Sequence, residues 1–359
     1  MSLIDRLKKA SKIELTSTLN DSKLADRTVI DTGIPALNIV LGGSLDGGLT
    51  SGVTTICGES RTFKSVCSLV CAKAYLDKYQ DAVLIFYDSE MGASKDYFDS
   101  LGIDSNRVLY VPITDIEMLK FDIVSQLEEL KRGDHAIFVV DSIGNLASKK
   151  ETQDAIDEKS VADMSRAKSL KSLFRLITPQ LNFKDIPCVC ISHTYKSIGT
   201  FIPTDVLSGG SGVLYSSDIV INITRSVDKQ GSELVGYNFN MNIMKSRHSR
   251  EKARVPLNVT FNNGINVYSG LLEMALASGD VVKPSNGWYQ RVDCETGEIV
   301  GNKLRANDTN THEFWDPILK GQHFKQWVEH TFGVGSNKLL ADNTNETQLE
   351  PAIEQFTSE

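Results

Sequence analysis

Residues 58–65 read Gly-Glu-Ser-Arg-Thr-Phe-Lys-Ser. This stretch matches the phosphate-loop pattern G-x-x-x-x-G-K-[ST], except that Phe63 stands where the second glycine belongs. In that pattern the lysine reaches nucleotide phosphates and the hydroxyl residue binds Mg²⁺. The sequence therefore predicts a nucleotide-binding loop made of Gly58, Glu59, Ser60, Arg61, Thr62, Phe63, Lys64 and Ser65.

The residues around this loop favour the same interpretation. An apolar run at 53–57 precedes the loop and predicts a buried strand. Apolar residues at helical spacing follow it, namely Val66, Leu69, Val70 and Ala74. A strand, loop and helix in this order aim backbone N–H groups and a helix N-terminus at an anion. The alternative is a serine- and glycine-containing turn before an ordinary helix.

Composition limits the class of protein. The chain has 359 residues, of which 41% are hydrophobic, and its net charge is −8. The chain has no overall positive charge that would attract nucleic acid, so any nucleic-acid binding must depend on local basic patches. No run has the length of a membrane span, and the first residues lack a signal-peptide core. The scattered cysteines, without a CxxC pair, indicate reduced intracellular thiols.

Strand and helix patterns alternate through the middle of the chain. Strand-like runs occupy residues 83–87, 108–112, 136–140, 187–191 and 218–223. Helical patterns lie between them, as at 115–131, where apolar residues repeat every three or four positions. Continuous apolar strands alternating with helices predict an α/β fold with a mostly parallel sheet covered on both faces. Later runs at 237–244 and 255–261 have short connections and predict antiparallel strands.

The pattern divides the chain into four predicted parts. Residues 1–30 form an amphipathic helix and linker, and this helix cannot bury its apolar face alone, so we expect it to pack on another subunit. Residues 31–270 form the α/β core. Residues 271–335 form a small domain with a helix, a hairpin near Trp288 and a last helix. Residues 336–359 form an acidic tail.

Polar residues follow several predicted strands at the sheet edge where ligands bind. Asp141 ends the strand at 136–140 and matches an acid that holds a water of the Mg²⁺ bound by Ser65; alternatively it caps the next loop. Glu90 follows the strand at 83–87 and suits the orientation of an attacking water, with Asp88 as its competitor. His193 follows the strand at 187–191, where a polar side chain can reach the γ-phosphate and report its loss; a surface histidine at a strand end is the alternative.

Two long polar segments, 146–162 and 195–213, interrupt the core. After the first, Lys168, Lys171 and Arg175 share one face of a predicted helix, a candidate track for a phosphodiester backbone. The alternative is an ordinary solvated helix face. The second segment contains a glycine-rich stretch that permits close backbone approach to phosphates, at Gly209, Gly210 and Ser211.

A basic segment at 245–254 lies far from the phosphate loop in the sequence. Lys245 and Arg247 suit the neutralisation of a nucleotide bound by a neighbouring subunit, in the manner of an arginine finger. A solubilising turn is the alternative.

Several strings together resemble the RecA-type recombinases. They are FYDSEMG at 86–92, FVVDSIGNLASKKET at 138–152, the helix at 164–177, NIMKSR at 242–247 and SNGWY at 285–289. Phe63 is similar to the residue found in the bacteriophage branch of this family. The resemblance implies a RecA-like P-loop core, a short N-terminal oligomerisation helix and a small α+β C-terminal domain.

The resemblance also implies roles for residues. Glu90 corresponds to the catalytic glutamate and Tyr97 to a tyrosine that stacks on adenine. His193 stands where a glutamine couples the γ-phosphate to the second DNA-binding segment. Lys245 and Arg247 correspond to the pair that reaches the ATP of the adjacent protomer. The implied DNA-binding residues are Lys168, Lys171, Arg175, Gly209, Gly210 and Ser211.

The implied function is that of an ATP-dependent DNA recombinase with ATP and Mg²⁺ as cofactors. It would form a helical filament on single-stranded DNA and pair it with a duplex, in phage recombination, replication and repair. Its partners would be both forms of DNA, itself, a mediator and a single-strand-binding protein, in the cytoplasm of the infected bacterial host. A hexameric helicase and a DNA scaffold that does not hydrolyse ATP are the alternatives.

Overall fold

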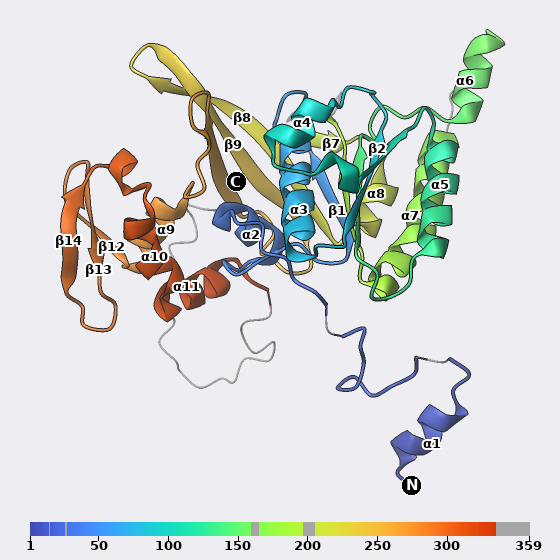
Figure 1. Ribbon diagram of the computed structural model, residues 1–359, viewed down its shortest axis with the longest axis horizontal. Helices are drawn as coiled ribbons and strands as arrows, with labels where there is room; N and C mark the ends of the chain where they lie inside the picture. The colour runs from blue at the N-terminus through green and yellow to red at the C-terminus, as the bar shows by residue number, and fades with distance from the viewer. Residues whose placement is uncertain (14, 26, 159–164, 197–204, 335–359) are drawn as a thin grey trace.

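The fold centres on one nine-stranded sheet with the order β11-β10-β9-β8-β1-β5-β4-β2-β3 (Figure 1). It is seen in a computed structural model that describes the chain except residues 14, 26, 159–164, 197–204 and 335–359. The strands from β8 to β3 in this order pair in parallel. They are β1 (Gly52–Cys57), β2 (Val83–Asp88), β3 (Val108–Pro112), β4 (Ala136–Asp141), β5 (Pro187–Ile191) and β8 (Ile219–Gln230).

The remaining strands of the sheet are antiparallel. β8 turns back into β9 (Glu233–Ser246), which pairs with β10 (Arg254–Thr260). β10 in turn pairs with the short strand β11 (Gly264–Ile265). The predicted strand at 237–244 lies within β9, and those at 218–223 and 255–261 match β8 and β10 to within one residue at one end. β8 and β9 continue further as a long hairpin beyond the core (Figure 1). The predicted α/β class with a mostly parallel central sheet is confirmed.

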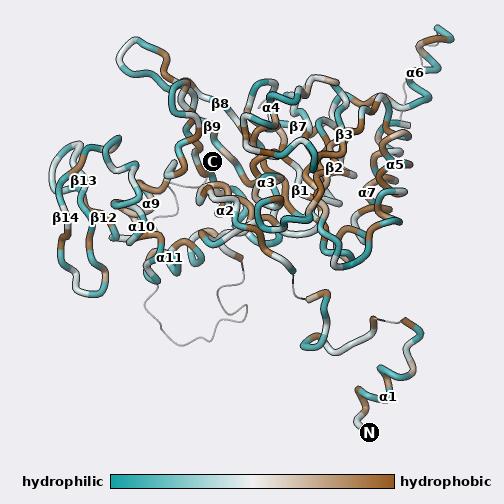
Figure 2. The backbone as a smooth tube through the Cα atoms, viewed as in Figure 1, coloured by the Kyte–Doolittle hydropathy of each residue, from teal (hydrophilic) through white to brown (hydrophobic). Residues whose placement is uncertain are grey.

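Helices cover both faces of the sheet because its central strands bury side chains on both sides. Along β2, Leu84 and Phe86 join one hydrophobic cluster, whereas Ile85 and Tyr87 join the other. The first cluster includes α2 (Pro35–Gly42), α3 (Lys64–Lys78) and α4 (Lys95–Ser100). The second includes α5 (Ile116–Glu129), α7 (Ser165–Lys184) and α8 (Ser211–Ser216). Figure 2 shows the hydrophobic residues concentrated in these central elements.

The C-terminal segment packs on the first face of the core. It contains α9 (Leu271–Ser278), β12 (Val281–Ser285), β13 (Trp288–Val292), β14 (Ile299–Leu304), α10 (His312–Lys320) and α11 (Gln322–Phe332). The three strands form a separate antiparallel sheet. Trp315 and Phe324 are fully buried in the hydrophobic cluster that also holds α2. β14 and α10 had no counterpart in the sequence prediction. The predicted domain boundaries stay a prediction, and the tail at 336–359 lies outside the described residues.

The two long polar segments hold more regular structure than the sequence suggested. The first contains α6 (Lys149–Ile156), whose N-terminus is closed by a capping box between Ser148 and Glu151. The second contains β6 (Thr194–Lys196) and β7 (Asp205–Leu207), which pair as a short antiparallel sheet, and then α8. Residues 159–164 and 197–204 within these segments lie outside the described part of the chain.

The N-terminal helix α1 (Leu3–Ala10) stands apart from the body of the protein (Figure 1). None of its residues is buried, and Leu3, Ile4 and Leu7 are more than half exposed. A capping box between Ser2 and Asp5 fixes its first turn. Helices this short gain most of their stability from packing, so a partner surface is expected to cover this apolar stripe. Among the described residues, no helix is both long and apolar enough to cross a bilayer.

Candidate nucleotide site and nucleic-acid interface

The phosphate loop joins the last residue of β1 to the first residue of α3, as the sequence predicted. Gly58 has a φ of 150°, and a Cβ atom there would lie 2.4 Å from the carbonyl oxygen of Ile223. Only glycine fits this close approach to β8. Glu59, Ser60 and Arg61 are exposed at the tip of the loop. Thr62 is buried and donates its hydroxyl hydrogen to the Glu59 carbonyl.

Phe63 occupies a left-handed backbone conformation with a φ of 67°. This conformation explains the glycine of the general pattern, because a side chain there costs about 1–2 kcal/mol. The Phe63 ring points into the protein and stacks on Phe239 of β9, with ring centroids 4.7 Å apart and planes 18° from parallel. Such a pair contributes about 0.5–1.5 kcal/mol beyond area burial. The stacking energy is therefore of the size needed to offset the backbone strain.

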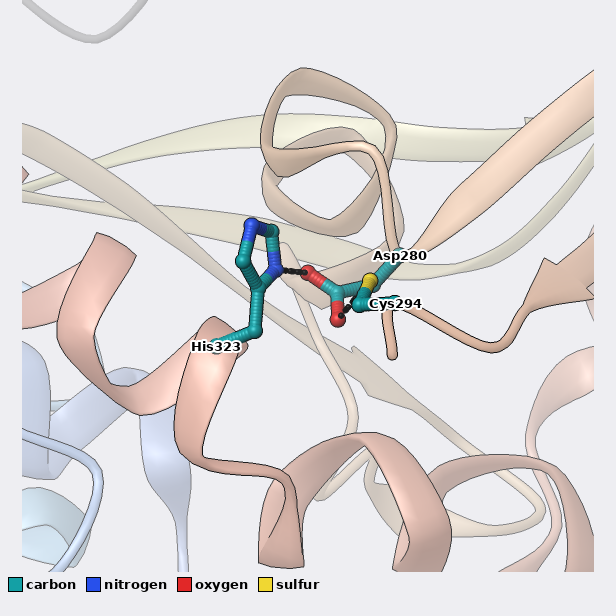
Figure 3. A group of neighbouring side chains, drawn as sticks. All are labelled: Asp280, Cys294 and His323. Carbon is teal, nitrogen blue, oxygen red and sulfur yellow. Dashed lines mark hydrogen bonds and ion pairs between the residues drawn. The ribbon is translucent and has the colours of Figure 1, made fainter. Parts of the chain in front are cut away.

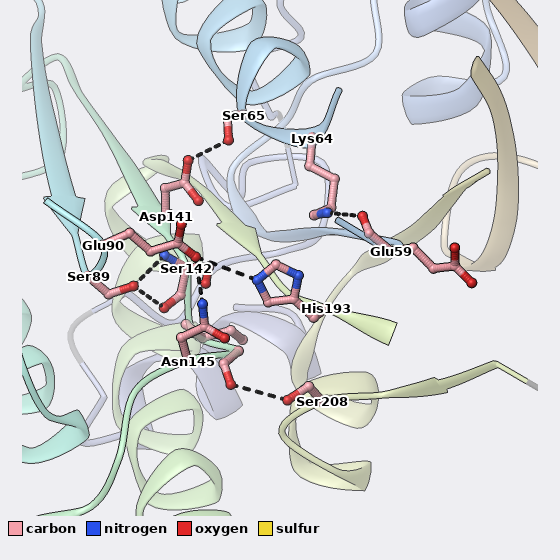
Figure 4. Close-up of polar contacts among 12 residues, drawn as sticks. Glu59, Lys64, Ser65, Ser89, Glu90, Asp141, Ser142, Asn145, His193 and Ser208 are labelled. Carbon is pink, nitrogen blue, oxygen red and sulfur yellow. Dashed lines mark hydrogen bonds and ion pairs between the residues drawn. The ribbon is translucent and has the colours of Figure 1, made fainter. Parts of the chain in front are cut away.

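Lys64 and Ser65 begin α3 beside the end of β4 (Figure 4). The Lys64 ammonium donates to the Glu59 carbonyl oxygen at 2.5 Å. The Ser65 hydroxyl donates to Oδ2 of Asp141 at 2.6 Å. A hydroxyl and a carboxylate held together at a helix N-terminus are oxygen ligands of the kind Mg²⁺ prefers. The residues predicted for Mg²⁺, Ser65 and Asp141, thus fit the ion chemically.

The electrostatics of this cluster reflect its burial. Burial raises the pKa of Asp141, and the nearby carboxylates Glu90 and Asp88 act in the same direction, against the Ser65 hydrogen bond and Lys64. Burial lowers the pKa of Lys64, against the attraction of Asp141. Each charged form is therefore held in an environment that disfavours it. A cation beside Asp141 and an anion beside Lys64 would both relieve this cost.

Asp88 and Glu90 have different surroundings although both follow β2. Asp88 is 3% exposed, and its carboxylate accepts hydrogen bonds from the backbone N–H groups of Glu90, Met91 and Ala93. Its acceptor sites are thus occupied in shaping the turn after the strand. Glu90 is exposed, with its carboxylate turned toward the edge of the sheet. This geometry favours Glu90 over Asp88 as the carboxylate that contacts a substrate or an attacking water.

The Glu90 carboxylate is held from two sides (Figure 4). Asn145 donates its amide N–H to Oε1 at 2.6 Å, and Nε2 of His193 lies 3.7 Å from the same oxygen. Burial lowers the pKa of His193, as does Lys64, whereas Glu90 opposes this shift. Gly144 permits the approach, since a Cβ there would lie 2.7 Å from the His193 ring. Gly144 and Asn145 lie in the string at 138–152 that resembles the RecA-type recombinases, but the sequence alone assigned neither residue a role.

A cavity of about 260 Å³ connects these groups. Its lining includes Ser65, Glu90, Tyr97 and Asp141. All four were predicted from the sequence to take part in nucleotide binding or catalysis. Tyr97 lies on α4 and is half-buried, and burial raises the pKa of its hydroxyl to about 12. The phenol is therefore neutral at physiological pH and presents an aromatic face, as stacking on a base requires.

The candidate DNA-binding segments lie next to one another. Lys168, Lys171 and Arg175 are exposed on α7, whose opposite face is buried in the second hydrophobic cluster. A Cβ at Gly209 would touch Leu170 of α7 at 3.2 Å, and one at Gly212 would touch Lys171 at 3.0 Å. The glycine-rich stretch therefore lies directly against the helix that carries the basic stripe.

The turn before α8 has left-handed backbone, with φ of 107° at Gly209 and 74° at Gly210. Both positions favour glycine for this reason. Ser211 begins α8, and its side chain lies outside the described part of the structure. Arg166 ties the neighbouring segments together, because its guanidinium donates to the carbonyls of Ile143, Gly144 and Leu146.

Lys245 and Arg247 lie at the other end of the strands from the phosphate loop. β9 ends beside the first residue of β8, whereas the loop follows the last residue of β1. The Lys245 ammonium donates to three carbonyls at the C-terminal end of α8, those of Leu214, Tyr215 and Ser217. Nε of Arg247 lies 2.8 Å from the buried Asp218 carboxylate. Neither side chain is placed to reach the nucleotide site of its own subunit.

This arrangement defines a class of protein. A phosphate loop follows the central parallel strand β1, Asp141 ends β4, and Glu90 follows β2, which lies next to β4 in the sheet. This arrangement characterises the RecA-like P-loop nucleotide-binding proteins.

The comparisons with known proteins identify the family. The family model of the RecA N-terminal domain matches residues 3–266. The family model of the C-terminal domain of the bacteriophage T4 recombination and repair protein matches residues 268–328. The chain therefore belongs to the RecA family. It is 44% identical to the recombination and repair protein (UvsX) of Enterobacteria phage T4, over 99% of this chain and 93% of that protein.

Bacterial relatives are more distant. The RecA protein of Paenarthrobacter aurescens (strain TC1) is 25% identical over 90% of this chain and 89% of its own length. That of Ectopseudomonas oleovorans is 26% identical over 94% of this chain and 90% of its own length. The predicted RecA-type family and its phage branch are confirmed.

Replacing Asp141 with Asn should stabilise the free protein at neutral pH. A carboxyl whose folded-state pKa is raised destabilises the fold once it ionises, and this effect disappears below the unfolded pKa, near 4. We expect Asp141→Asn to raise the melting temperature at pH 7 to 8 in buffer free of Mg²⁺ and nucleotide. The gain should shrink as the pH falls toward about 4.

Thermal unfolding followed by circular dichroism measures this difference. Asp308→Asn, at an exposed position on a surface turn, serves as the matched control and should leave the melting temperature unchanged. A lower melting temperature for Asp141→Asn at neutral pH would contradict the electrostatic explanation.

The stacked pair Phe63 and Phe239 should behave as a coupled unit. Phe63→Leu and Phe239→Leu each remove the ring contact while keeping an apolar side chain. Urea unfolding of both single variants and the double variant should give a coupling free energy of about 0.5–1.5 kcal/mol. Phe63→Leu combined with Phe138→Leu, on the opposite face of the sheet, should be additive. Additivity of the Phe63 and Phe239 variants would refute the stacking role.

Proposed function

We propose that the protein is an ATP-dependent DNA recombinase that forms a helical filament on single-stranded DNA and pairs that strand with a homologous duplex. The observation that carries this proposal is the continuity between two sites. Glu90 and His193 meet at the nucleotide site, and His193 leads directly into the segment that packs on the basic stripe of α7. Family membership supports the same function.

The hydrolytic site follows from the phosphate loop and its neighbours. Ser65 would hold Mg²⁺ directly and Asp141 through a water, and the ion would supply positive charge for the phosphates. Lys64 would contact the terminal phosphates. Glu90 would orient the attacking water for γ-phosphate hydrolysis. Asn145 holds the Glu90 carboxylate at 2.6 Å, so we assign it as a positioning residue for that water.

The second half of the nucleotide site would come from a neighbouring subunit. Lys245 and Arg247 lie away from their own phosphate loop, so only another copy can bring them to the nucleotide. This contact would be heterologous and repeat from subunit to subunit, which generates a helical filament. The exposed apolar stripe of α1 would add a second contact between neighbours.

DNA binding would rest on local charge, since the net charge of the chain is −8. Lys168, Lys171 and Arg175 would neutralise phosphates, and the turn at Gly209 and Gly210 would bring backbone N–H groups close to the strand. Such contacts read no sequence and leave bases free, so homology would be tested by base pairing.

His193 would couple the two sites. The backbone N–H of Thr194 donates to the Gly58 carbonyl at 3.3 Å, and that of Ser208 donates to the His193 carbonyl at 2.8 Å. The phosphate loop and the glycine turn are therefore linked through the residues around His193. A change at the γ-phosphate would move the DNA-binding turn by this route. In the infected bacterial host, a mediator and a single-strand-binding protein would control filament assembly.

Glu90→Gln tests the hydrolytic assignment. The amide cannot accept a proton, so DNA-stimulated ATP hydrolysis should fall about 100-fold or more, while ATP-dependent filaments on single-stranded DNA persist in negative-stain images. Glu129→Gln, on the exposed end of α5, is the matched control and should hydrolyse normally. Wild-type turnover by Glu90→Gln would rule out its catalytic role, and closed rings would favour a helicase instead.

Mixing two inactive variants tests the contribution of the neighbour. Glu90→Gln damages the site of its own subunit, and Arg247→Ala damages the site of the next one. In a randomly mixed filament, about a quarter of the interfaces combine an intact site with an intact Arg247. ATPase activity should return to a comparable fraction of the wild-type rate. No recovery on mixing would place Arg247 outside the shared site.

A further inference from the structure

A second cluster of reactive side chains, formed by Asp280, Cys294 and His323, lies in the C-terminal segment (Figure 3). Asp280 precedes β12, Cys294 follows β13, and His323 lies in the first turn of α11. Sγ of Cys294 donates to Oδ1 of Asp280 at 3.1 Å, and Nδ1 of His323 lies 3.1 Å from Oδ2. The two ends of the β12–β13 hairpin and the first turn of α11 thus converge on one carboxylate.

The donor atoms have the chemistry and spacing of a zinc site. Thiolate, imidazole and carboxylate are the three side-chain groups that bind Zn²⁺. In a tetrahedral site, neighbouring donor atoms are roughly 3.5 Å apart. Here one donor atom from each residue lies within 4.8 Å of the other two. Small side-chain rotations would therefore close the cluster around an ion.

The central ligand is already oriented by its surroundings. Asp280 is only 5% exposed, and the Ser278 hydroxyl donates to its Oδ2 at 2.5 Å. The Val292 N–H donates to the Asp280 carbonyl and fixes the backbone between β12 and β13. Hydrogen bonds of this kind, from groups outside the ligand set, commonly hold metal-binding carboxylates in place.

Solvent reaches the cluster from one side. Cys294 is exposed and the His323 side chain is 51% exposed, whereas Asp280 forms the floor. The cavity above it has a volume of about 460 Å³, and its lining includes Arg291, Glu295 and Gln322. An ion can enter from solvent, and a water can occupy the fourth position of a tetrahedron.

We propose that Asp280, Cys294 and His323 bind Zn²⁺, with water as the fourth ligand, and that the ion fastens α11 to the β12–β13 hairpin. Binding releases the thiol proton to solvent, and the neutral imidazole keeps its proton on Nε2. No sequence motif marks this site, since its donors are single residues on separate elements. It is independent of the nucleotide site and of the proposed function.

Thiol labelling of the intact protein tests the site directly. Cys294 is exposed and the other five cysteines are buried, so a thiol reagent reacts first with Cys294 in the folded chain. After treatment with a chelator, one equivalent of ZnCl₂ should slow this labelling at least about tenfold, because a metal-bound thiolate is protected. Co²⁺ in place of Zn²⁺ should give a thiolate-to-metal charge-transfer band. Unchanged labelling in the presence of ZnCl₂ would overturn the proposal.

Variants separate this site from binding elsewhere on the chain. His323→Gln removes one ligand at a half-exposed position where misfolding is not expected, and it should abolish Zn²⁺ protection while Cys294 still reacts. His330→Gln, exposed on the same helix, is the matched control and should keep full protection. Zn²⁺ should also raise the melting temperature of the wild type and not that of Cys294→Ser. Equal protection in His323→Gln and the wild type would refute the assignment.

Discussion

The parallel register of the central strands decides where the nucleotide-site residues lie and where Lys245 and Arg247 lie. Because β1, β4, β2 and β5 run in one direction, their carboxyl ends meet at one edge of the sheet. Asp88 pairs with Asp141, and Ile56 pairs with Ile191, so the phosphate loop, the carboxylates and His193 emerge together. No single loop builds the site; it exists only when the sheet forms.

The same register separates the two halves of the proposed catalytic site. Lys245 and Arg247 lie near the opposite edge, where Lys245 binds the end of α8 and Arg247 contacts Asp218. In the proposed function, a subunit is therefore incomplete as a catalyst until a neighbour supplies Lys245 and Arg247. Since α8 follows the glycine turn, Lys245 also contacts the element that packs on the basic stripe. The residues proposed for nucleotide binding, DNA binding and assembly thus lie on one set of connected elements.

Local sequence signals were sufficient for the sheet, the phosphate loop and the acids at the strand ends. Each of these has its pattern within a few adjacent residues. Contacts between residues that are distant in sequence were not predicted. Examples are the stacking of Phe63 on Phe239 and the hydrogen bond that Asn145 donates to Glu90. The sequence around Asp88 also resembles that of a catalytic acid, and its role as an acceptor for backbone N–H groups is visible only in the fold. α6 was missed although the capping-box signal, Ser148 with Glu151, was present in the sequence.

An electron cryomicroscopy structure of the protein on single-stranded DNA, with a non-hydrolysable ATP analogue and Mg²⁺, would show whether neighbouring subunits share each nucleotide site. We expect a helical filament with Lys245 and Arg247 at the nucleotide of the next subunit. The same filament should place the DNA backbone between the α7 stripe and the turn at Gly209. A filament or ring in which Lys245 remains on its own α8 carbonyls, away from every nucleotide, would contradict it.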